Sequence, residues 1–476
     1  MGEARSEMTK VTGKDCFSAT TAMKIAFVSQ PFDTILPPNQ NSVGTCTLGA
    51  ARKLALYADV LVYGVEHNHR NPSAPSVQNG INFRFFPSTL RDRMLFDAQN
   101  KYAKLFHHFT PISTSSWLFP DYGRQVAVDL QREGCDVIHL QHCSQYAPII
   151  RTLNPKAKIV LHLHAEWFSQ TDPAVLAIRL KAVDLLTTVG EYVTEKTRRA
   201  FPAVARRCAT IYNGVDVKEF PREADYRAGR ERKVKRILYG GSVSPHKGVH
   251  VLFEAFALVA RAYPNVHLDV AGPLGHDPIE EHFDLKDAET IKTVAPFYAT
   301  RPRSRISAIL DHGSSRKSEY LTHLEMNLPP DVANKVSVLG MIPREELLER
   351  YYSSDVFAFP PIWDEGFGLP PVEAMAAGLP VVASRSGTVE ETVVDGLTGF
   401  LVAKNHAGEL AQALLVLLKD DACREAMGRA GRRRVLKHFT WSRVAADMFT
   451  RYEQLCERET SQRPNRAVAI NERIDF

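Results

Sequence analysis

The sequence predicts an α/β protein with two Rossmann-like domains, each built on a doubly wound parallel sheet, that face a central cleft. Short apolar segments recur along the chain, and most are separated by stretches long enough for a helix. Strands that alternate with helices are typical of a parallel sheet covered on both faces. The chain has 476 residues, which is more than one compact core usually holds, so we expect two domains.

The first domain is expected over residues 23–220, after a polar, aperiodic tail over residues 1–22. Its first buried strand is Lys24 to Ser29, which reads KIAFVS. The stretch 90–122 is aromatic and irregular, and helical packing explains it better than a lid over an acceptor. Further strands are expected at 60–63, 82–86, 136–140, 159–162, 185–189 and 210–212.

A charged stretch over residues 221–235 predicts the linker, and the strand pattern restarts after it. The second domain is therefore expected over residues 236–439, with an unusually long connection between 273 and 335 whose role the sequence leaves open. A last amphipathic helix is expected at about 440–459, before a polar tail over 460–476. The strands of this half are expected at 236–239, 266–270, 336–339, 356–359, 380–383 and 400–402.

The composition is ordinary for a globular protein, at 44% hydrophobic and 24% charged residues. The net charge of +5 neither demands nor excludes an acidic partner, and we expect no nucleic acid. No apolar run reaches membrane-spanning length, and the first twenty residues lack the core of a signal peptide. We expect a cytoplasmic location, with peripheral contact at the inner membrane face left open. The seven cysteines include no C-x-x-C and predict reduced thiols.

The most informative stretch is residues 357–402, FAFPPIWDEGFGLPPVEAMAAGLPVVASRSGTVEETVVDGLTGFLV. It predicts strand, loop and helix twice over, with polar residues at the carboxyl ends of strands, where ligands bind in parallel sheets. Glu365 in the loop and Glu373 in the first turn of the helix have seven residues between them. Carboxylates in such places accept hydrogen bonds from sugar hydroxyls. Gly387 and Thr388 precede another helix start, whose N–H groups suit a phosphate.

This stretch resembles the donor-binding signature of retaining GT-B glycosyltransferases of family four: E-x7-E, G-x-P-V-V-A-S, a glycine loop and D-G-x-x-G-x-L-V. The resemblance implies the GT-B fold and transfer, with retention, of a sugar from a nucleoside diphosphate sugar to a hydroxyl acceptor. It implies that Glu373 holds the ribose and that Glu365 meets the sugar or the developing oxocarbenium ion. The donor loop would also include Gly366, Phe367, Gly368 and Leu369.

The resemblance implies no separate cofactor, because the nucleotide sugar is a co-substrate, with UDP expected before GDP as its nucleotide. The acceptor is left open between a small molecule, a glycan and a lipid-linked sugar, and so is the oligomeric state. No Asp-x-Asp, H-E-x-x-H or P-loop stands at a plausible site. We therefore expect no catalytic metal, with positive protein groups in its electrostatic role.

A second constellation begins at Tyr239, YGGSVSPHKGVHVLFEAF, and predicts a strand, a glycine-rich turn and a helix. It resembles the signature G-R-x-x-x-x-K-G of the same family, with Gly241 as its glycine and Lys247 as its lysine. Lys247 stands where an ammonium neutralises a diphosphate. Ser242 stands where the family usually has arginine, so one of two expected cations is missing. Either Lys247 with the helix start at Gly387 suffices, or another arginine substitutes.

Other candidate residues rest on the resemblance. Gly44, in NQNSVGTCTLG, occupies the place of the glycine loop of the first strand, where the backbone approaches the donor. Met341 and Ile342 follow a strand where the nucleotide base would pack. His164 ends the fifth strand and resembles the histidine near the transferred sugar. The acceptor-side candidates are His139, His142 and Trp167.

Two kinds of alternative remain open from the sequence. One is a GT-B-like epimerase or a phosphorylase, against which stand the spaced glutamate pair and the lack of an obvious lysine for a pyridoxal cofactor. The other is a catalytically weak or inactive sugar-nucleotide-binding or scaffold protein, which the serine at position 242 favours. No side chain is an obvious nucleophile, so the leaving phosphate itself is expected to take the proton of the acceptor.

Overall fold

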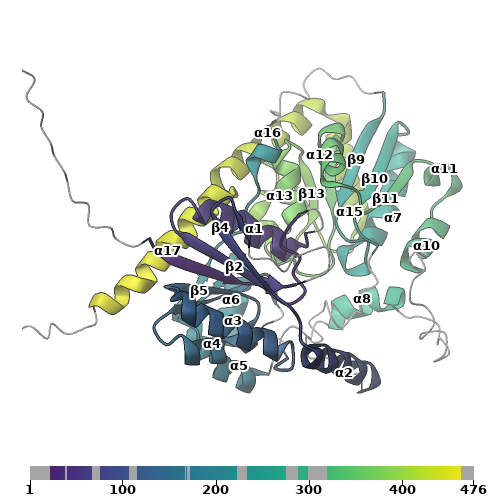
Figure 1. Ribbon diagram of the computed structural model, residues 1–476. Coiled ribbons are helices and arrows are strands. Elements are labelled where there is room, and N and C mark those ends of the chain that lie inside the picture. The colour runs from purple at the N-terminus through teal and green to yellow at the C-terminus, as the bar shows by residue number, and fades with distance from the viewer. Residues whose placement is uncertain are drawn as a thin grey trace, which may run out of the picture.

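The computed structural model describes residues 22–37, 40–66, 76–106, 115–166, 168, 172–221, 233–274, 288–298 and 319–461. They form two α/β halves, each around its own sheet (Figure 1). The predicted fold class is confirmed. Trp167 and nearly all of the expected linker, residues 222–232, lie outside the described residues.

The sheet of the first half has eight strands in the order β3-β4-β2-β1-β5-β6-β7-β8, all parallel except the pair β3–β4. β3 was missed by the sequence analysis. It pairs with β4 through the turn Asn79-Gly80, where both φ angles are positive, at 53° and 78°. The strands are β1 (Lys24–Val28), β2 (Asp59–Val65), β3 (Ser76–Gln78), β4 (Ile81–Phe86), β5 (Val137–Gln141), β6 (Lys158–Leu163), β7 (Leu185–Thr188) and β8 (Cys208–Thr210).

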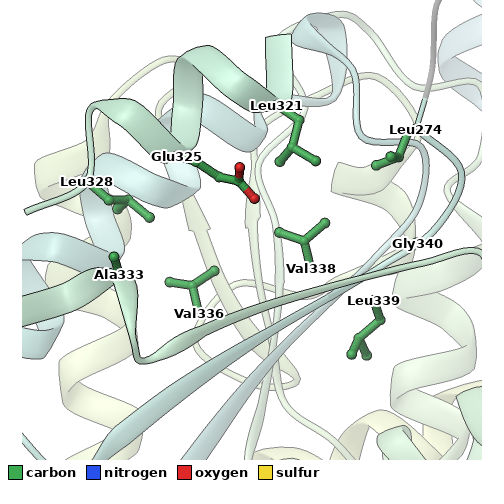
Figure 2. Close-up of a pocket in the computed structure, with 9 residues that line it drawn as sticks. All are labelled: Leu274, Leu321, Glu325, Leu328, Ala333, Val336, Val338, Leu339 and Gly340. Atoms are coloured by element: carbon green, nitrogen blue, oxygen red, sulfur yellow. The ribbon is translucent and has the colours of Figure 1, made fainter. Parts of the chain in front are cut away.

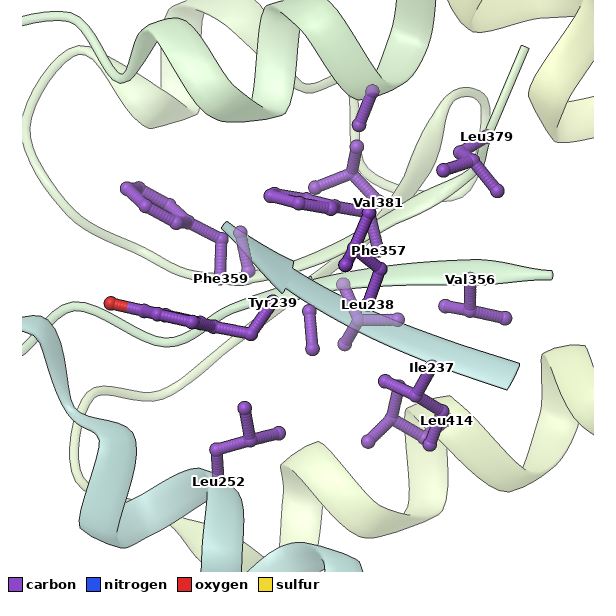
Figure 3. Packing of buried hydrophobic residues seen from close by; sticks show 14 of the residues in the cluster. Ile237, Leu238, Tyr239, Leu252, Val356, Phe357, Phe359, Leu379, Val381 and Leu414 are labelled. Atoms are coloured by element: carbon purple, nitrogen blue, oxygen red, sulfur yellow. The ribbon is translucent and has the colours of Figure 1, made fainter. Parts of the chain in front are cut away.

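The sheet of the second half is wholly parallel, in the order β11-β10-β9-β12-β13-β14. Its central strands are buried on both faces, and Figure 3 shows Ile237, Leu238 and Tyr239 of β9 packed among neighbouring strands and Leu252 and Leu414 of two helices. The strands are β9 (Lys235–Gly240), β10 (Val266–Ala271), β11 (Val336–Gly340), β12 (Val356–Phe359), β13 (Val381–Ser384) and β14 (Gly399–Val402).

Helices follow most strands, as a doubly wound sheet requires. Those of the first half are α1 (Ser42–Leu54), α2 (Leu90–Phe106), α3 (Pro120–Glu133), α4 (Ala147–Leu153), α5 (Pro173–Leu180) and α6 (Glu191–Ala200). Those of the second half are α7 (Val249–Ala262), α8 (Ala288–Tyr298), α10 (Glu319–Met326), α11 (Pro330–Ala333), α12 (Arg344–Ser353), α13 (Leu369–Ala376), α14 (Val389–Thr392), α15 (Ala407–Lys419) and α16 (Asp421–His438). The long connection after β10 thus contributes α8, α10 and α11.

The last helix, α17 (Trp441–Ser461), leaves the second half and crosses onto the first, where it lies against α1 (Figure 1). Its apolar side chains belong to the same core cluster as those of β1, β2 and α1. The Tyr452 hydroxyl lies 2.7 Å from Nδ1 of His139 in β5, and both residues are fully buried. Among the described helices, none combines the length and the apolar character needed to cross a membrane.

Candidate active site

Lys247 and Glu365 meet at the carboxyl edge of the second sheet, on the loops after β9 and β12. Lys247 ends the short 3-10 turn η7 (Pro245–Lys247), and its ammonium donates to Oε1 of Glu365. The same oxygen accepts the indole N–H of Trp363 at 2.6 Å, and the ammonium lies 4.5 Å from the centroid of that ring. The two charged side chains are only 17% and 7% exposed. The two side chains therefore form a preorganised and mostly desolvated ion pair at the predicted diphosphate site.

Backbone contacts from the next loop hold Glu365 in place. Its N–H donates to the Ser386 hydroxyl at 3.1 Å, and that hydroxyl donates to the Trp363 carbonyl at 2.6 Å. The Thr388 N–H donates to the Glu365 carbonyl at 3.0 Å. We expected this amide to be free for a phosphate, and that detail is wrong because the loop uses it. The helix after Gly387 is also only four residues long, so its dipole is small.

Glu373, the predicted ribose ligand, is already engaged by protein groups. Its Oε1 lies 2.7 Å from the Arg344 guanidinium, and its Oε2 accepts the Tyr351 hydroxyl at 3.0 Å. Arg344 also binds Glu219, at 2.6 Å, so it bridges two carboxylates. Burial lowers the pKa of Arg344, but its two carboxylate partners outweigh this and raise it above the ordinary value. Glu373 and Arg344 line a small cavity of about 80 Å³ between the two halves.

The first half contributes His164, which follows β6. Its Nε2–H donates to the Gln141 side-chain oxygen at 2.7 Å, since an amide oxygen only accepts. Its backbone N–H donates to Nε2 of His142 at 2.9 Å. The loop after β12 lies directly opposite, because a Cβ added to Gly366 would come within 2.2 Å of the His164 carbonyl oxygen. Only a glycine at position 366 permits this close approach of the two halves.

The histidines of this edge are neutral at physiological pH. Burial lowers the pKa of His142 from 6.5 to about 4 and that of His139 to about 3. Burial, and then the nearby His162 and His142, hold the pKa of His164 well below its usual range. His139 lies within β5, fully buried against α17, whereas His142 follows the strand end. No cluster of three or more His, Cys, Asp or Glu side chains among the described residues is arranged to hold a metal ion.

Gly44 lies in the first turn of α1, and its missing side chain makes room for the chain itself. A Cβ there would come within 2.0 Å of the Thr34 carbonyl oxygen. The Gly44 N–H donates to the capping side chain of Asn41 at 2.7 Å. The packing of the loop after β1 therefore already requires a glycine at position 44. Its predicted approach to a donor stays a prediction.

The remaining predicted donor residues differ in their burial. Phe367 is buried and packs on Tyr212 and Phe439, with ring centroids 6.4 and 5.9 Å away, so it supports the loop from beneath. Met341 is 77% exposed beyond the end of β11, and its contact with the nucleotide base stays a prediction. Gly241 and Ser242 lie at the end of β9, where the Ser242 carbonyl accepts a hydrogen bond from the Tyr239 hydroxyl. Ile342 and Leu369 are half-buried. Gly368 is the N-cap residue of α13.

A larger, mainly apolar pocket of about 410 Å³ lies beside the edge strand β11 (Figure 2). Leu321 and Leu328 approach it from α10 and its C-terminal end, and Val336 and Val338 from β11. It ends at Gly340, next to the exposed Met341. It contains none of the predicted site residues, so it adjoins the candidate active site without being part of it.

Two family models match this chain, one on each half. The model described as "Glycosyltransferase Family 4" matches residues 77–219, and the model described as "Glycosyl transferases group 1" matches residues 317–434. The second match contains the Glu365 and Glu373 loop, and the first contains the strand that carries His164. The chain belongs to the group 1 glycosyltransferases.

Individual relatives and solved structures are similar to this chain over most of its length. The glycosyltransferase is 25% identical over 346 residues to spore coat protein SA of Bacillus subtilis, covering 70% of this chain and 82% of that protein. Sucrose-phosphate synthase from Thermosynechococcus elongatus has a similar fold, with a TM-score of 0.63 at 20% identity over 92% of this chain and all of that one. The Anabaena protein HepE in complex with UDP-glucose gives a TM-score of 0.59 at 18% identity over 92% and 100%. These neighbours establish the GT-B fold.

The glycosyltransferase closes its two halves with polar contacts that the sequence analysis missed. Glu391 of α14 accepts the backbone N–H groups of Glu191 and Tyr192, at 2.8 and 2.6 Å, at the start of α6 in the first half. The N-cap of α6 is Gly190, which has no side chain to cap the helix. A carboxylate from the other half thus fills the cap position, where the helix dipole favours a negative charge.

Asp364, the neighbour of Glu365, makes a second such contact. It accepts the Tyr192 hydroxyl at 2.5 Å and lies 3.7 Å from the Lys196 ammonium, both on α6, and it binds Lys404 of its own half. These hydrogen bonds, with the attractive charges of Lys404 and Lys196, outweigh burial and lower the pKa of Asp364. The sequence offered one signal for this contact, an acidic residue directly before Glu365. It did not indicate which residues Asp364 binds.

Proposed function

We propose that this glycosyltransferase moves a sugar from a nucleoside diphosphate sugar to a hydroxyl acceptor, with retention of the anomeric configuration. The observation that carries the proposal is the buried pair of Lys247 and Glu365, set opposite His164 at the contact between the two halves. The HepE structure with UDP-glucose supports a UDP-sugar as the donor, with GDP-sugars next. The acceptor class stays open between a small molecule, a glycan and a lipid-linked sugar.

Charge develops on the leaving diphosphate as the glycosidic bond breaks. Lys247 is the cation placed to stabilise it, since groups fixed beforehand in a desolvated site lower the barrier most effectively. In the free protein its ammonium is held by Glu365 and by the face of Trp363. A phosphate entering beside the pair shares the ammonium, and Glu365 remains to accept hydroxyls of the sugar.

His164 is proposed to meet the transferred sugar as a neutral hydrogen-bonding group. Its Nε2–H is committed to Gln141, which leaves Nδ1 as an acceptor in the neutral ring. It is therefore not a charged acid. No side chain is assigned as the nucleophile, so the leaving phosphate takes the acceptor proton on the same face of the sugar, which gives retention.

A two-part experiment tests the proposal. UDP-, GDP- and ADP-sugars are first screened by thermal shift, and the best donor is then incubated with candidate acceptors while free nucleoside diphosphate is measured. The expected result is release of the diphosphate that depends on acceptor, with a product whose anomeric configuration by NMR equals that of the donor. Binding without any release would favour a sugar-nucleotide sensor, and an inverted product would overturn retention.

A further inference from the structure

The long connection after β10 touches the start of helix α7, which follows the Lys247 turn. Its helices α8 and α10 lie at the side of the second half, near α7 (Figure 1). The hydroxyl of Tyr320, on α10, accepts the backbone N–H of His250 at 2.9 Å. The same hydroxyl lies 2.8 Å from Nδ1 of His250. Tyr320 and His250 are 6% and 5% exposed, so these bonds are shielded from water.

Two polar groups of His250 face this hydroxyl, namely its backbone N–H and the Nδ1 atom of its ring. Burial, and then the charge of His323, lower the pKa of His250 from 6.5 to about 4, so its ring is neutral. The Tyr320 oxygen accepts the backbone N–H of His250, and the hydroxyl forms a second hydrogen bond with Nδ1, in which the ring tautomer decides the donor. One hydroxyl therefore serves both polar groups of His250 that face it.

Tyr320 supplies a helix cap that the local sequence lacks. The N-cap of α7 is Gly248, in the left-handed region with φ of 70°, and it has no side chain to accept an N–H of the first turn. Uncapped first-turn N–H groups weaken a helix start. Phe297 of α8 also packs on His250, with its ring centroid 4.2 Å from that of His250 and 5.5 Å from that of Tyr320. Both helices thus contact one residue of the first turn of α7.

That turn continues directly into Lys247. α8 also packs against η7, the turn that Lys247 ends. The carbonyl of His246 in η7 accepts the N–H of Ile362 at 2.9 Å, which ties the turn to the loop that carries Trp363 and Glu365. A continuous series of contacts and chain segments therefore connects Tyr320, through His250 and η7, to Lys247.

We propose that Tyr320 is a positioning residue of the donor site, which fixes the Lys247 turn for the diphosphate by capping helix α7. The inference rests on the proposed role of Lys247. It gives the long connection a function, because this insertion supplies a constraint at the phosphate site where Ser242 has replaced the usual arginine. Tyr320 itself does not touch the donor and acts only through α7.

The test measures the dissociation constant of a nucleoside diphosphate by titration calorimetry. The ligand is whichever of UDP, GDP and ADP the wild type binds most tightly. Tyr320→Phe keeps the ring and loses both bonds, and we expect about fivefold weaker binding, as for the loss of a helix cap. Lys247→Ala should weaken binding about tenfold. Because Tyr320 acts through Lys247, the double variant should bind no more weakly than Lys247→Ala alone.

Tyr263→Phe is the matched control, since this tyrosine is the C-cap of the same helix, and it should bind as the wild type does. His250→Ala removes the ring bond and the packing on Phe297 but keeps the backbone cap, and it should weaken binding about twofold, which keeps the test available if Tyr320→Phe folds poorly. Wild-type affinity in Tyr320→Phe, or losses that multiply to about fiftyfold in the double variant, would overturn the inference alone. Wild-type affinity in Lys247→Ala would instead overturn the proposed function on which it rests.

Discussion

Replacing Lys247 by methionine separates its structural role from its chemical role. Methionine keeps an apolar stem over Trp363 but removes the charge, which leaves Glu365 with the indole N–H and no ammonium. Removing one partner of a buried ion pair costs about 3–5 kcal/mol. Lys247 and Glu365 keep 17% and 7% exposure, so water offsets part of this. We therefore expect a loss of about 2–3 kcal/mol from the stability of the second half.

Scanning calorimetry measures this loss as a fall in the melting temperature of the second half. For a domain of about 200 residues, 1 kcal/mol shifts the midpoint by about 2–4 °C, so a fall of about 4–12 °C is expected. Adding Glu365→Gln to Lys247→Met removes the unpaired charge and should restore most of the lost stability. Turnover should behave differently, since losing such a stabiliser of the transition state lowers it by about 10²-fold or more and the second change restores nothing.

Three results would refute this reasoning. A melting temperature for Lys247→Met equal to that of the wild type would mean that Glu365 finds water or another donor, and that the pair is not a preorganised charge. A double variant as unstable as the single one would mean that the loss comes from packing around Trp363. Normal turnover in Lys247→Met would remove the lysine from the mechanism whatever its effect on stability.

Four further predictions follow from the site. Glu373→Ala should weaken nucleotide binding by roughly 1.5–3 kcal/mol, because the ribose hydroxyls lose a charged acceptor; unchanged affinity in calorimetry would exclude Glu373 from the donor site. Ser242→Arg should raise the turnover of Lys247→Ala by restoring a cation, and a slow variant with no gain would leave the serine unexplained. Turnover should survive EDTA, and a loss that magnesium restores would contradict a metal-free mechanism. The pKa of His142 is about 4 when folded and near 6.5 when unfolded, so its contribution is complete above pH 6.5 and is lost towards pH 4. Unfolding by urea at pH 7 and pH 5 should show that His142→Gln removes about 1–2 kcal/mol of this acid sensitivity, and an unchanged difference would mean that His142 is not buried neutral.

The sequence predicted what local pattern determines. The parallel strands were found, although β8 lies at Cys208–Thr210 and not at 210–212, because most of them read as short apolar runs between helix-length segments. The antiparallel β3 was missed although Asn79-Gly80 is a typical signal for a two-residue hairpin turn. β3 has only three residues, of which Val77 and Gln78 are both exposed, and such a run carries no periodicity.

The partners of the site residues could not be predicted, because they come from distant parts of the chain. The spacing of Glu365 and Glu373 marks both as candidates, but nothing near Glu373 indicates that Arg344 binds it. The Glu391 cap joins residues 200 positions apart, in different halves. Gly44 shows a second reason why site residues are hard to predict. A glycine that matches a family position can instead be required by the packing of its own loop, and only the structure shows the Thr34 carbonyl beside it.

The path of α17 affects the order in which this chain folds during synthesis. The core of the first half includes side chains from positions beyond 440, namely Trp441, Val444, Ala445, Met448 and Tyr452. The ribosome has therefore made the whole second half before the first half can complete its core. N-terminal domains usually fold first as they emerge. Here the part of the first half that packs on α17 can form only after the final helix has left the exit tunnel, when the strands of both halves have already been made.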